Sequence, residues 1–164
     1  MNENVTLSAD DIEVLTMIRG GHSLMSELVD FSGWVGEKVN RSIEVLDENR
    51  YIARRGYRGA DFWAFAITQK GLDALPPLSG EEAKLFEYGL TPMDIRILKL
   101  FNEIGGEHLP GKIIQEKITD DVERKEAVAA VLKLLRMEYL NQMGFIRRRV
   151  SINELGKKVL VKVA

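Results

Sequence analysis

The chain has 164 residues, of which 45% are hydrophobic and 29% charged, so it can form a packed core and is neither disordered nor fibrous in composition. It contains no cysteine, which excludes disulfide bonds, thiol catalysis and cysteine metal sites. Its two histidines, His22 and His108, cannot form a metal site without carboxylate ligands. Its formal net charge of −2 argues against a protein that coats nucleic acid indiscriminately.

No signal for membrane insertion or secretion stands out. Apolar runs stay well short of the roughly 20 residues that cross a bilayer, and residues 1–10 are polar. We therefore expect a cytoplasmic protein with no membrane partner, no metal and no cofactor.

One pattern of residues occurs twice along the chain. Ser8, Tyr51 and Thr68 of the first copy correspond to Thr91, Tyr139 and Asn153 of the second, each with similar apolar neighbours. We interpret the copies as two domains, residues 1–78 and 90–164. A linker helix is expected over residues 79–89, where Ser79 and Glu82 have the spacing of a capping box.

The first copy predicts three helices, a β-hairpin and a fourth helix. The first expected helix is capped by Ser8 and ends at Gly20, the second covers about 24–30, and the third covers about 34–49. The expected strands cover 51–55 and 62–67, and Thr68 caps the helix that follows them. The third helix is expected to bury one face made by Val35, Val39, Ile43 and Leu46.

The second copy predicts the same order of elements. Its helices are expected from Thr91 to Ile104, from Pro110, over 121–138 and after Asn153, and its strands over 139–143 and 146–152. The fold class we expect is mainly α with small β-hairpin wings, an α+β arrangement.

Three segments of the first copy carry a family resemblance: Lys38 to Leu46, Arg50 to Arg55, and Thr68 to Leu72. With them the chain resembles the winged helix-turn-helix superfamily, in two tandem copies, and over Ser8 to Leu75 the DNA-binding domains of MarR-type regulators. The first copy is also similar to the winged-helix domain that precedes RIO-type kinases. The resemblance implies a fold that binds DNA or, in other members, proteins.

The third helix of the first copy is the candidate for reading DNA bases. Its outward face presents Trp34, Lys38, Asn40 and Arg41, of which the cations can contact guanine or phosphate and Asn40 can contact adenine. The alternative is a solvated face on which Glu37 pairs with Arg41.

The hairpin of the first copy adds Arg54, Arg55, Tyr57 and Arg58, a cluster suited to phosphate or minor-groove contacts. Charges on an exposed hairpin can also serve only to prevent aggregation. In the second hairpin, Arg147, Arg148 and Arg149 are candidate phosphate contacts, with a solvated strand as the alternative.

The long helix of the second copy lacks the base-reading residues. Val128, Leu132 and Leu135 instead form a second apolar line beside the core line of Ala127, Val131 and Leu134. We expect this second line to be sealed against the first domain, another subunit or another protein.

We expect no enzymatic activity. Residues 106–112 resemble a P-loop, but Ile113 replaces the Ser or Thr that would bind Mg²⁺, and kinase motifs are missing. The expected function is that of a DNA-binding protein, a transcription regulator in which the first domain reads duplex DNA and the second packs. The alternative is a non-enzymatic adaptor that binds proteins in a larger complex, with a homodimer as one form of contact.

Overall fold

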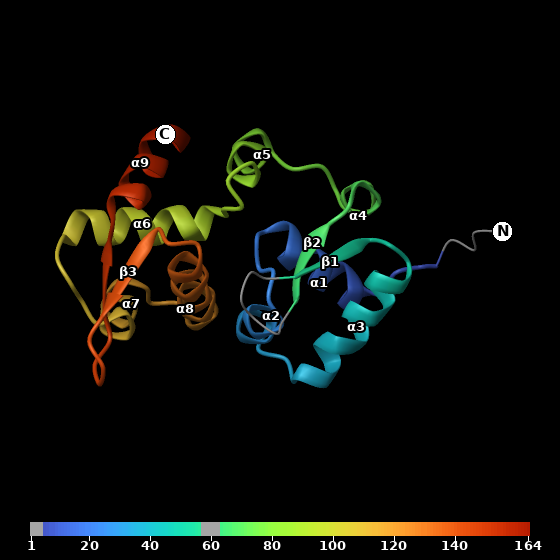
Figure 1. Cartoon of the computed structure of the whole chain (residues 1–164), viewed down its shortest axis with the longest axis horizontal. Helices are drawn as coiled ribbons and strands as arrows, with labels where there is room; N and C mark the ends of the chain where they lie inside the picture. Colours follow the sequence, from blue (N-terminus) through green and yellow to red (C-terminus); the bar gives the residue numbers. More distant parts are fainter. Residues whose placement is uncertain (1–4, 57–62) are drawn as a thin grey trace. The chain divides into compact units, whose positions relative to one another are not determined.

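The computed structural model describes residues 5–56 and 63–164 (Figure 1). They are mainly helical and include two small antiparallel β-hairpins, which confirms an α+β composition. The chain divides into two compact units, Met1–Gly89 and Leu90–Ala164, and buried hydrophobic side chains occur in both.

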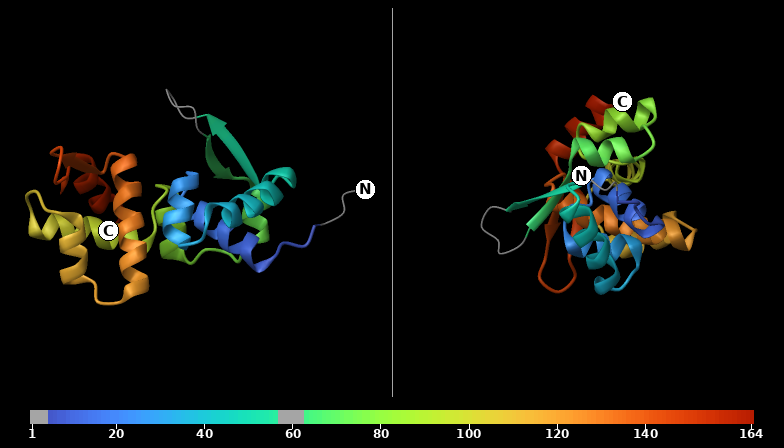
Figure 2. Two further views of the ribbon diagram at one scale, coloured as in Figure 1. Left: turned by 90° about the horizontal axis from the view of Figure 1, so that it is seen from below. Right: turned by 90° about the vertical axis from the view of Figure 1, so that its right-hand side faces the viewer.

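In unit 1 the helices α1, α2 and α3 surround a core that includes Leu15, Ile43 and Leu46, all fully buried. Strands β1 and β2 form a ribbon that projects from these helices (Figure 2). The elements are α1 (Ala9–Arg19), α2 (Met25–Ser32), α3 (Gly36–Glu48), β1 (Ile52–Gly56), β2 (Trp63–Ile67), α4 (Gln69–Ala74) and α5 (Gly80–Phe86).

In unit 2 the long helix α8 packs against α6 and α7, and α9 packs against α6. Ile97, Phe101 and Leu134 are fully buried in its core. The elements are α6 (Pro92–Ile104), α7 (Pro110–Lys117), α8 (Asp121–Arg136), β3 (Leu140–Met143), β4 (Arg149–Ile152) and α9 (Glu154–Val163).

The first helix of each unit begins with a complete capping box, as its sequence predicts. The Asp11 amide donates to Ser8 Oγ at 3.1 Å, and Asp11 Oδ2 accepts from the Ser8 amide at 3.0 Å. The Asp94 amide donates to Thr91 Oγ1 at 3.3 Å, and Asp94 Oδ2 accepts from the Thr91 amide at 2.7 Å. These reciprocal bonds satisfy amides that the helix leaves unpaired at its start.

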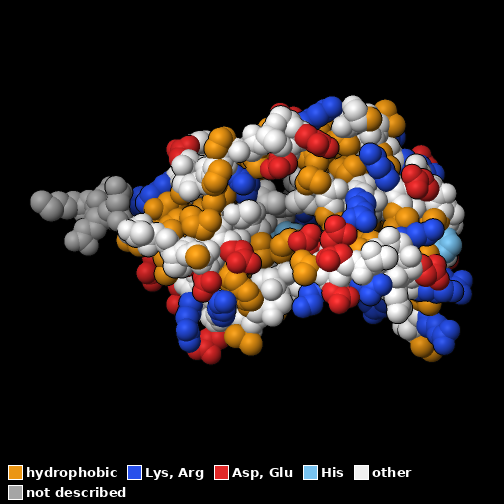
Figure 3. Space-filling model, turned by 180° about the vertical axis from the view of Figure 1, so that it is seen from behind, with side chains coloured by type: hydrophobic (Ala, Val, Ile, Leu, Met, Phe, Trp, Pro, Cys, Tyr) orange, Lys and Arg blue, Asp and Glu red, His pale blue; other side chains and the backbone are white. Residues whose placement is uncertain are grey.

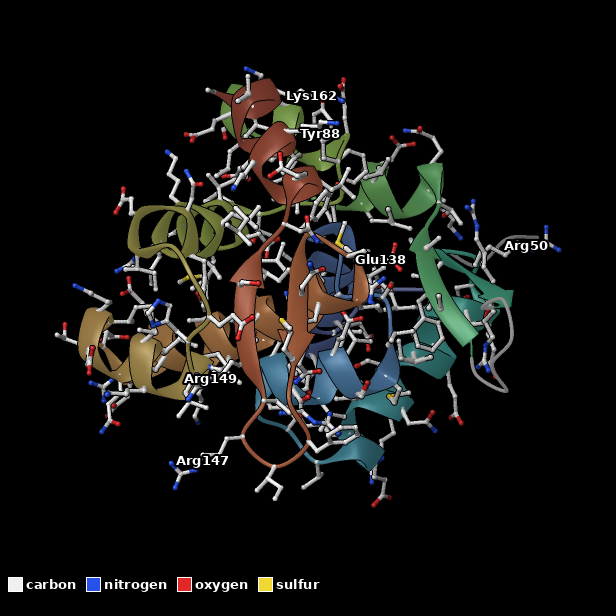
Figure 4. The ribbon with its side chains drawn as sticks, turned by 60° about the vertical axis from the view of Figure 1, so that its left-hand side comes forward. Arg50, Tyr88, Glu138, Arg147, Arg149 and Lys162 are labelled. Atoms are coloured by element: carbon white, nitrogen blue, oxygen red, sulfur yellow. The ribbon has the colours of Figure 1, made fainter. Side chains whose placement is uncertain are left out.

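The two units also share the joint between long helix and hairpin. Arg50 and Glu138, labelled in Figure 4, hold the same left-handed backbone, with φ of 60° and 63°. Thr68 Oγ1 donates to the Arg50 carbonyl at 2.7 Å, and Asn153 Nδ2 donates to the Glu138 carbonyl at 2.6 Å. The residue that caps the helix after each hairpin, α4 or α9, therefore also fixes the turn that starts the hairpin.

A glycine in the helix that follows each hairpin, α4 or α9, permits close packing on this joint. A Cβ at Gly71 would collide with the Tyr51 carbonyl oxygen and lie 2.7 Å from Ile67 Cγ1. A Cβ at Gly156 would collide with the Tyr139 carbonyl oxygen and lie 2.8 Å from Ile152 Cγ1. Both positions require glycine for the same steric reason.

The units differ in the charge that they bury. Asp94 and Lys133 are fully buried in unit 2 and form an ion pair of 2.5 Å between Oδ2 and Nζ. Burial raises the pKa of the Asp94 carboxyl above its ordinary value, and Lys133 opposes that rise. Lys133 links the start of α6 to the last turn of α8, a contact that sequence periodicity does not predict.

Several predicted boundaries are wrong. Val35 lies just before α3 and is 71% exposed, because its extended backbone takes its side chain off the helix face. The linker helix α5 ends at Phe86 rather than Gly89, and Ser79 Oγ accepts from the Glu82 amide at 3.3 Å. Residues 146–148 belong to the turn of the second hairpin, since β4 begins at Arg149.

Candidate nucleic-acid interface

The first candidate residues lie just before α3 and in its first turn. Trp34 packs against the core of unit 1 and is partly buried, so its predicted place on the outward face is wrong. Lys38 Nζ lies 3.8 Å from the centroid of the Trp34 ring and 3.7 Å from Asp10 Oδ1. This lysine is thus held between an aromatic face and a carboxylate.

The next candidates on α3 also have carboxylate partners. Asn40 Nδ2 donates to Glu44 Oε1 at 3.1 Å, and Arg41 lies 3.0 Å from Glu37 Oε1 in an exposed pair. Such pairs contribute only about 0.2–1 kcal/mol, so the arginine could exchange its partner for a phosphate. The carboxylates nevertheless interrupt the positive face that base reading would use.

In the first hairpin the two described arginines differ. Arg54 Nε lies 2.9 Å from Asp47 Oδ2, and its guanidinium is 5.9 Å from the centroid of the Phe65 ring. Arg55 is exposed and has no ion pair or side-chain hydrogen bond with any residue in 5–56 or 63–164. Tyr57 and Arg58 lie outside the described residues.

The second hairpin carries three consecutive cations without a partner among the described residues. Arg147, Arg148 and Arg149 are all exposed, and none has an ion pair or hydrogen-bonding side-chain partner in the described part of the chain. Arg147 and Arg149 extend from the same side of the hairpin (Figure 4). Three consecutive arginines are therefore available to an external anion.

The tip of this hairpin carries two exposed apolar side chains that sequence reasoning missed. Phe145 is 101% exposed and Ile146 is 96% exposed. The hairpin reaches beyond the helices of unit 2 (Figure 1), and hydrophobic side chains lie beside Lys and Arg side chains on the protrusion at the lower right of Figure 3. Gly144, a turn residue directly before Phe145, was the available signal.

The base of the second hairpin is fixed on both sides. Val150 is fully buried and pairs with Gln142 across the hairpin. On its other edge, the His108 amide donates to the Val150 carbonyl at 3.0 Å, and the Val150 amide donates to the His108 carbonyl at 2.7 Å. The exposed tip therefore extends from a hairpin base that is hydrogen-bonded on both edges.

The apolar line predicted on α8 is only partly covered. Leu135 is partly buried, but Val128 and Leu132 are 46% and 45% exposed, and Val122 on the same helix is 65% exposed. The sealed contact expected for this line stays a prediction, whereas the core line of Ala127, Val131 and Leu134 is buried as predicted.

The comparisons with known proteins find no matching protein-family model and no matching curated protein. Within residues 5–56 and 63–164, none of the helices combines the length and apolar character needed to span a membrane. In the same ranges no three His, Asp or Glu side chains are grouped as a metal ion would require.

Proposed function

We propose that this chain is a tandem winged helix-turn-helix protein that binds duplex DNA, with regulation of transcription as its role. Three helices, a hairpin and a further helix follow one another in both units, which supports the winged-helix assignment. The repeated joint at Arg50 and Glu138 supports a common origin for the two units. The regulatory role is supported by the resemblance of the first unit to MarR-type regulators.

The observation that carries the DNA proposal is the position of the free arginines. Arg55 lies on the first hairpin, and Arg147, Arg148 and Arg149 lie on the second, without carboxylate partners among the described residues. The α3 candidates each have such a partner. We therefore propose that the hairpins supply most of the phosphate contacts and that α3 contributes less than its sequence predicts.

Fluorescence anisotropy with a labelled duplex, titrated over a series of salt concentrations, tests this proposal. If four arginines contact phosphate, log affinity should fall against log salt with a slope of about −3.6. Replacing Arg147, Arg148 and Arg149 by Ala should reduce that slope by about 2.7.

A matched control removes the same charge elsewhere. The triple variant Lys157→Ala/Lys158→Ala/Lys162→Ala changes three exposed lysines on α9 and should leave the slope unchanged. If the two triple variants weaken binding equally, net charge rather than the hairpin governs the interaction. Absence of wild-type binding at low salt would contradict the DNA proposal itself.

A protein-binding adaptor is the second candidate, favoured by the exposed apolar side chains of α8. Val122, Val128 and Leu132 are all large hydrophobic residues more than two-fifths exposed. If a second copy of the chain covers them, Leu132→Glu should lower the mass measured by light scattering, because it places a charge in the contact. A wild-type chain that is monomeric at high concentration would exclude the homodimer.

A further inference from the structure

The most exposed large hydrophobic residues in the described structure lie at one place. Phe145 and Ile146 are adjacent at the tip of the second hairpin and are 101% and 96% exposed, against 78% for the next such residue, Val161. Because they contact almost nothing within the chain, they contribute little to its folding. An exposed apolar pair that does not stabilise the fold indicates a site of contact with a binding partner.

The turn holds these side chains outward. Gly144 has φ of +94°, and a Cβ there would lie 2.9 Å from the Arg147 carbonyl oxygen, so the turn is tight and requires glycine. β3 and β4 close with the pair Met143 and Arg149. The five residues between them form the tip, and the buried Val150 anchors it from the next position.

The chemistry of the tip combines a wedge with cations. Arg147 and Arg148 lie in the same turn as the apolar pair, and Arg149 follows directly. Glu107 is the one acidic residue that lines the shallow hollow beside the tip, where Arg147 and Arg149 also lie. The positive charge therefore exceeds the negative charge at this place, which complements a polyanion.

We propose that the tip enters the minor groove of duplex DNA and inserts Phe145 and Ile146 at a base step, so that the protein bends its DNA. This inference rests on the proposed DNA-binding function. Apolar side chains that enter the minor groove partly unstack a base step and kink the duplex by about 20–90°. Arginines beside them are attracted by the negative potential of a narrow minor groove and by the flanking phosphates.

DNA fits the tip better than a lipid bilayer does. Because Arg147 and Arg148 share the turn with the apolar pair, inserting that pair into hydrocarbon would draw two guanidinium groups toward the apolar region, which is costly. In the minor groove the same two groups meet phosphates and base-edge acceptors. A bilayer is therefore the alternative that the experiment must distinguish.

The test uses the full chain and a duplex of about 30 base pairs with one central TA step, a length and a step that reveal bending. Energy transfer between dyes at its ends reports the bend, and 2-aminopurine at the step reports unstacking. We expect the wild type to raise both signals. The variant Phe145→Ala/Ile146→Ala should bind with the wild-type salt slope but leave both signals at the level of free DNA.

Leu155→Ala/Val161→Ala is the matched control, since it truncates two exposed apolar residues on α9 and should bend DNA as the wild type does. A wild type that binds without bending, or a tip variant that bends DNA fully, would overturn the inference and leave the DNA-binding proposal standing. A wild type that does not bind DNA at all would overturn both this inference and the DNA-binding proposal. Binding to phosphatidylserine vesicles that needs Phe145 and Ile146, with no DNA bending, would identify a bilayer contact instead.

Discussion

The two units share a backbone plan but present different surfaces. Both units have a capping box, with Asp11 and Asp94 as the acidic residues, and a left-handed joint, at Arg50 and Glu138. Both also have a tightly packed glycine, Gly71 or Gly156. Their long helices differ, since α3 exposes charged pairs and α8 exposes valine and leucine. The comparison teaches that a few steric and capping positions fix this scaffold and leave its surface free to diverge.

The hairpins show the same divergence. In the first, Arg54 is tied to Asp47 and only Arg55 is free among its described arginines. In the second, three arginines are free beside an apolar tip. The free positive charge that we propose for DNA binding is therefore concentrated in unit 2, although the recognition-helix pattern in the sequence is concentrated in unit 1.

The buried ion pair gives the largest predicted difference between the units. Lys133→Leu should destabilise unit 2 by about 3–5 kcal/mol, because it leaves the Asp94 carboxyl buried without its cation. Both tryptophans, Trp34 and Trp63, belong to unit 1, so urea unfolding followed by fluorescence reports unit 1 and circular dichroism reports both units. Only the circular dichroism signal should shift to lower urea.

The double variant Asp94→Asn/Lys133→Leu is the control for this prediction. It removes the buried charge together with its partner and should regain part of the lost stability. A single variant that unfolds with the wild-type midpoint would mean that the ion pair does not support unit 2. Equal shifts of both signals would mean that the units unfold together.

Alanine at the packed glycines should affect both units alike. Gly71→Ala and Gly156→Ala should each cost about 1–3 kcal/mol in free energy of unfolding, because backbone oxygen rather than a flexible side chain opposes the new Cβ. At Gly36 and Gly111 an added Cβ would meet no non-neighbouring atom within 4 Å. Gly36→Ala and Gly111→Ala should therefore leave the free energy of unfolding unchanged or raise it by about 0.4–1 kcal/mol. Unequal costs at Gly71 and Gly156 would break the equivalence of the two joints.

Removing the shared cap should have a smaller effect. Thr68→Ala and Asn153→Ala each delete an acceptor for a helix amide and a donor to the turn carbonyl, and each should cost about 1 kcal/mol in thermal unfolding. Asn153→Asp keeps the capping oxygen and loses the amide donor, so it distinguishes the helix-amide contact from the turn-carbonyl contact. Thr68→Ser keeps both functions of the hydroxyl and is the control that should retain stability. An alanine variant without loss would show that its turn holds without the side chain.

The smallest expected effect separates the arginines of the first hairpin. Arg54→Ala should lower the free energy of unfolding by about 0.2–1 kcal/mol, because it breaks an exposed pair with Asp47. Arg55→Ala should leave stability unchanged and reduce the salt slope of DNA binding by about 0.9. A reduced salt slope for Arg54→Ala would show that its pair with Asp47 opens when DNA binds. A loss of stability for Arg55→Ala would contradict its assignment as the free arginine.

The sequence by itself determined the features that depend on neighbouring residues. The caps at Ser8, Thr91, Thr68 and Asn153 are confirmed, because capping needs only a suitable side chain three residues before a helix amide. Helical periodicity likewise located the buried residues Val39, Ile43 and Leu46 correctly. It failed at Val35, which lies before the helix begins.

Only the tertiary structure decided the features that depend on distant partners. Lys133 is buried because Asp94 reaches it from another helix. In the first unit, Lys38 and Arg54 pair with Asp10 and Asp47, carboxylates that the motif does not include. The end of the β3 and β4 ladder, and with it the exposure of Phe145 and Ile146, depends on where two strands stop pairing. Local propensity cannot specify that point, because pairing is a property of both strands together.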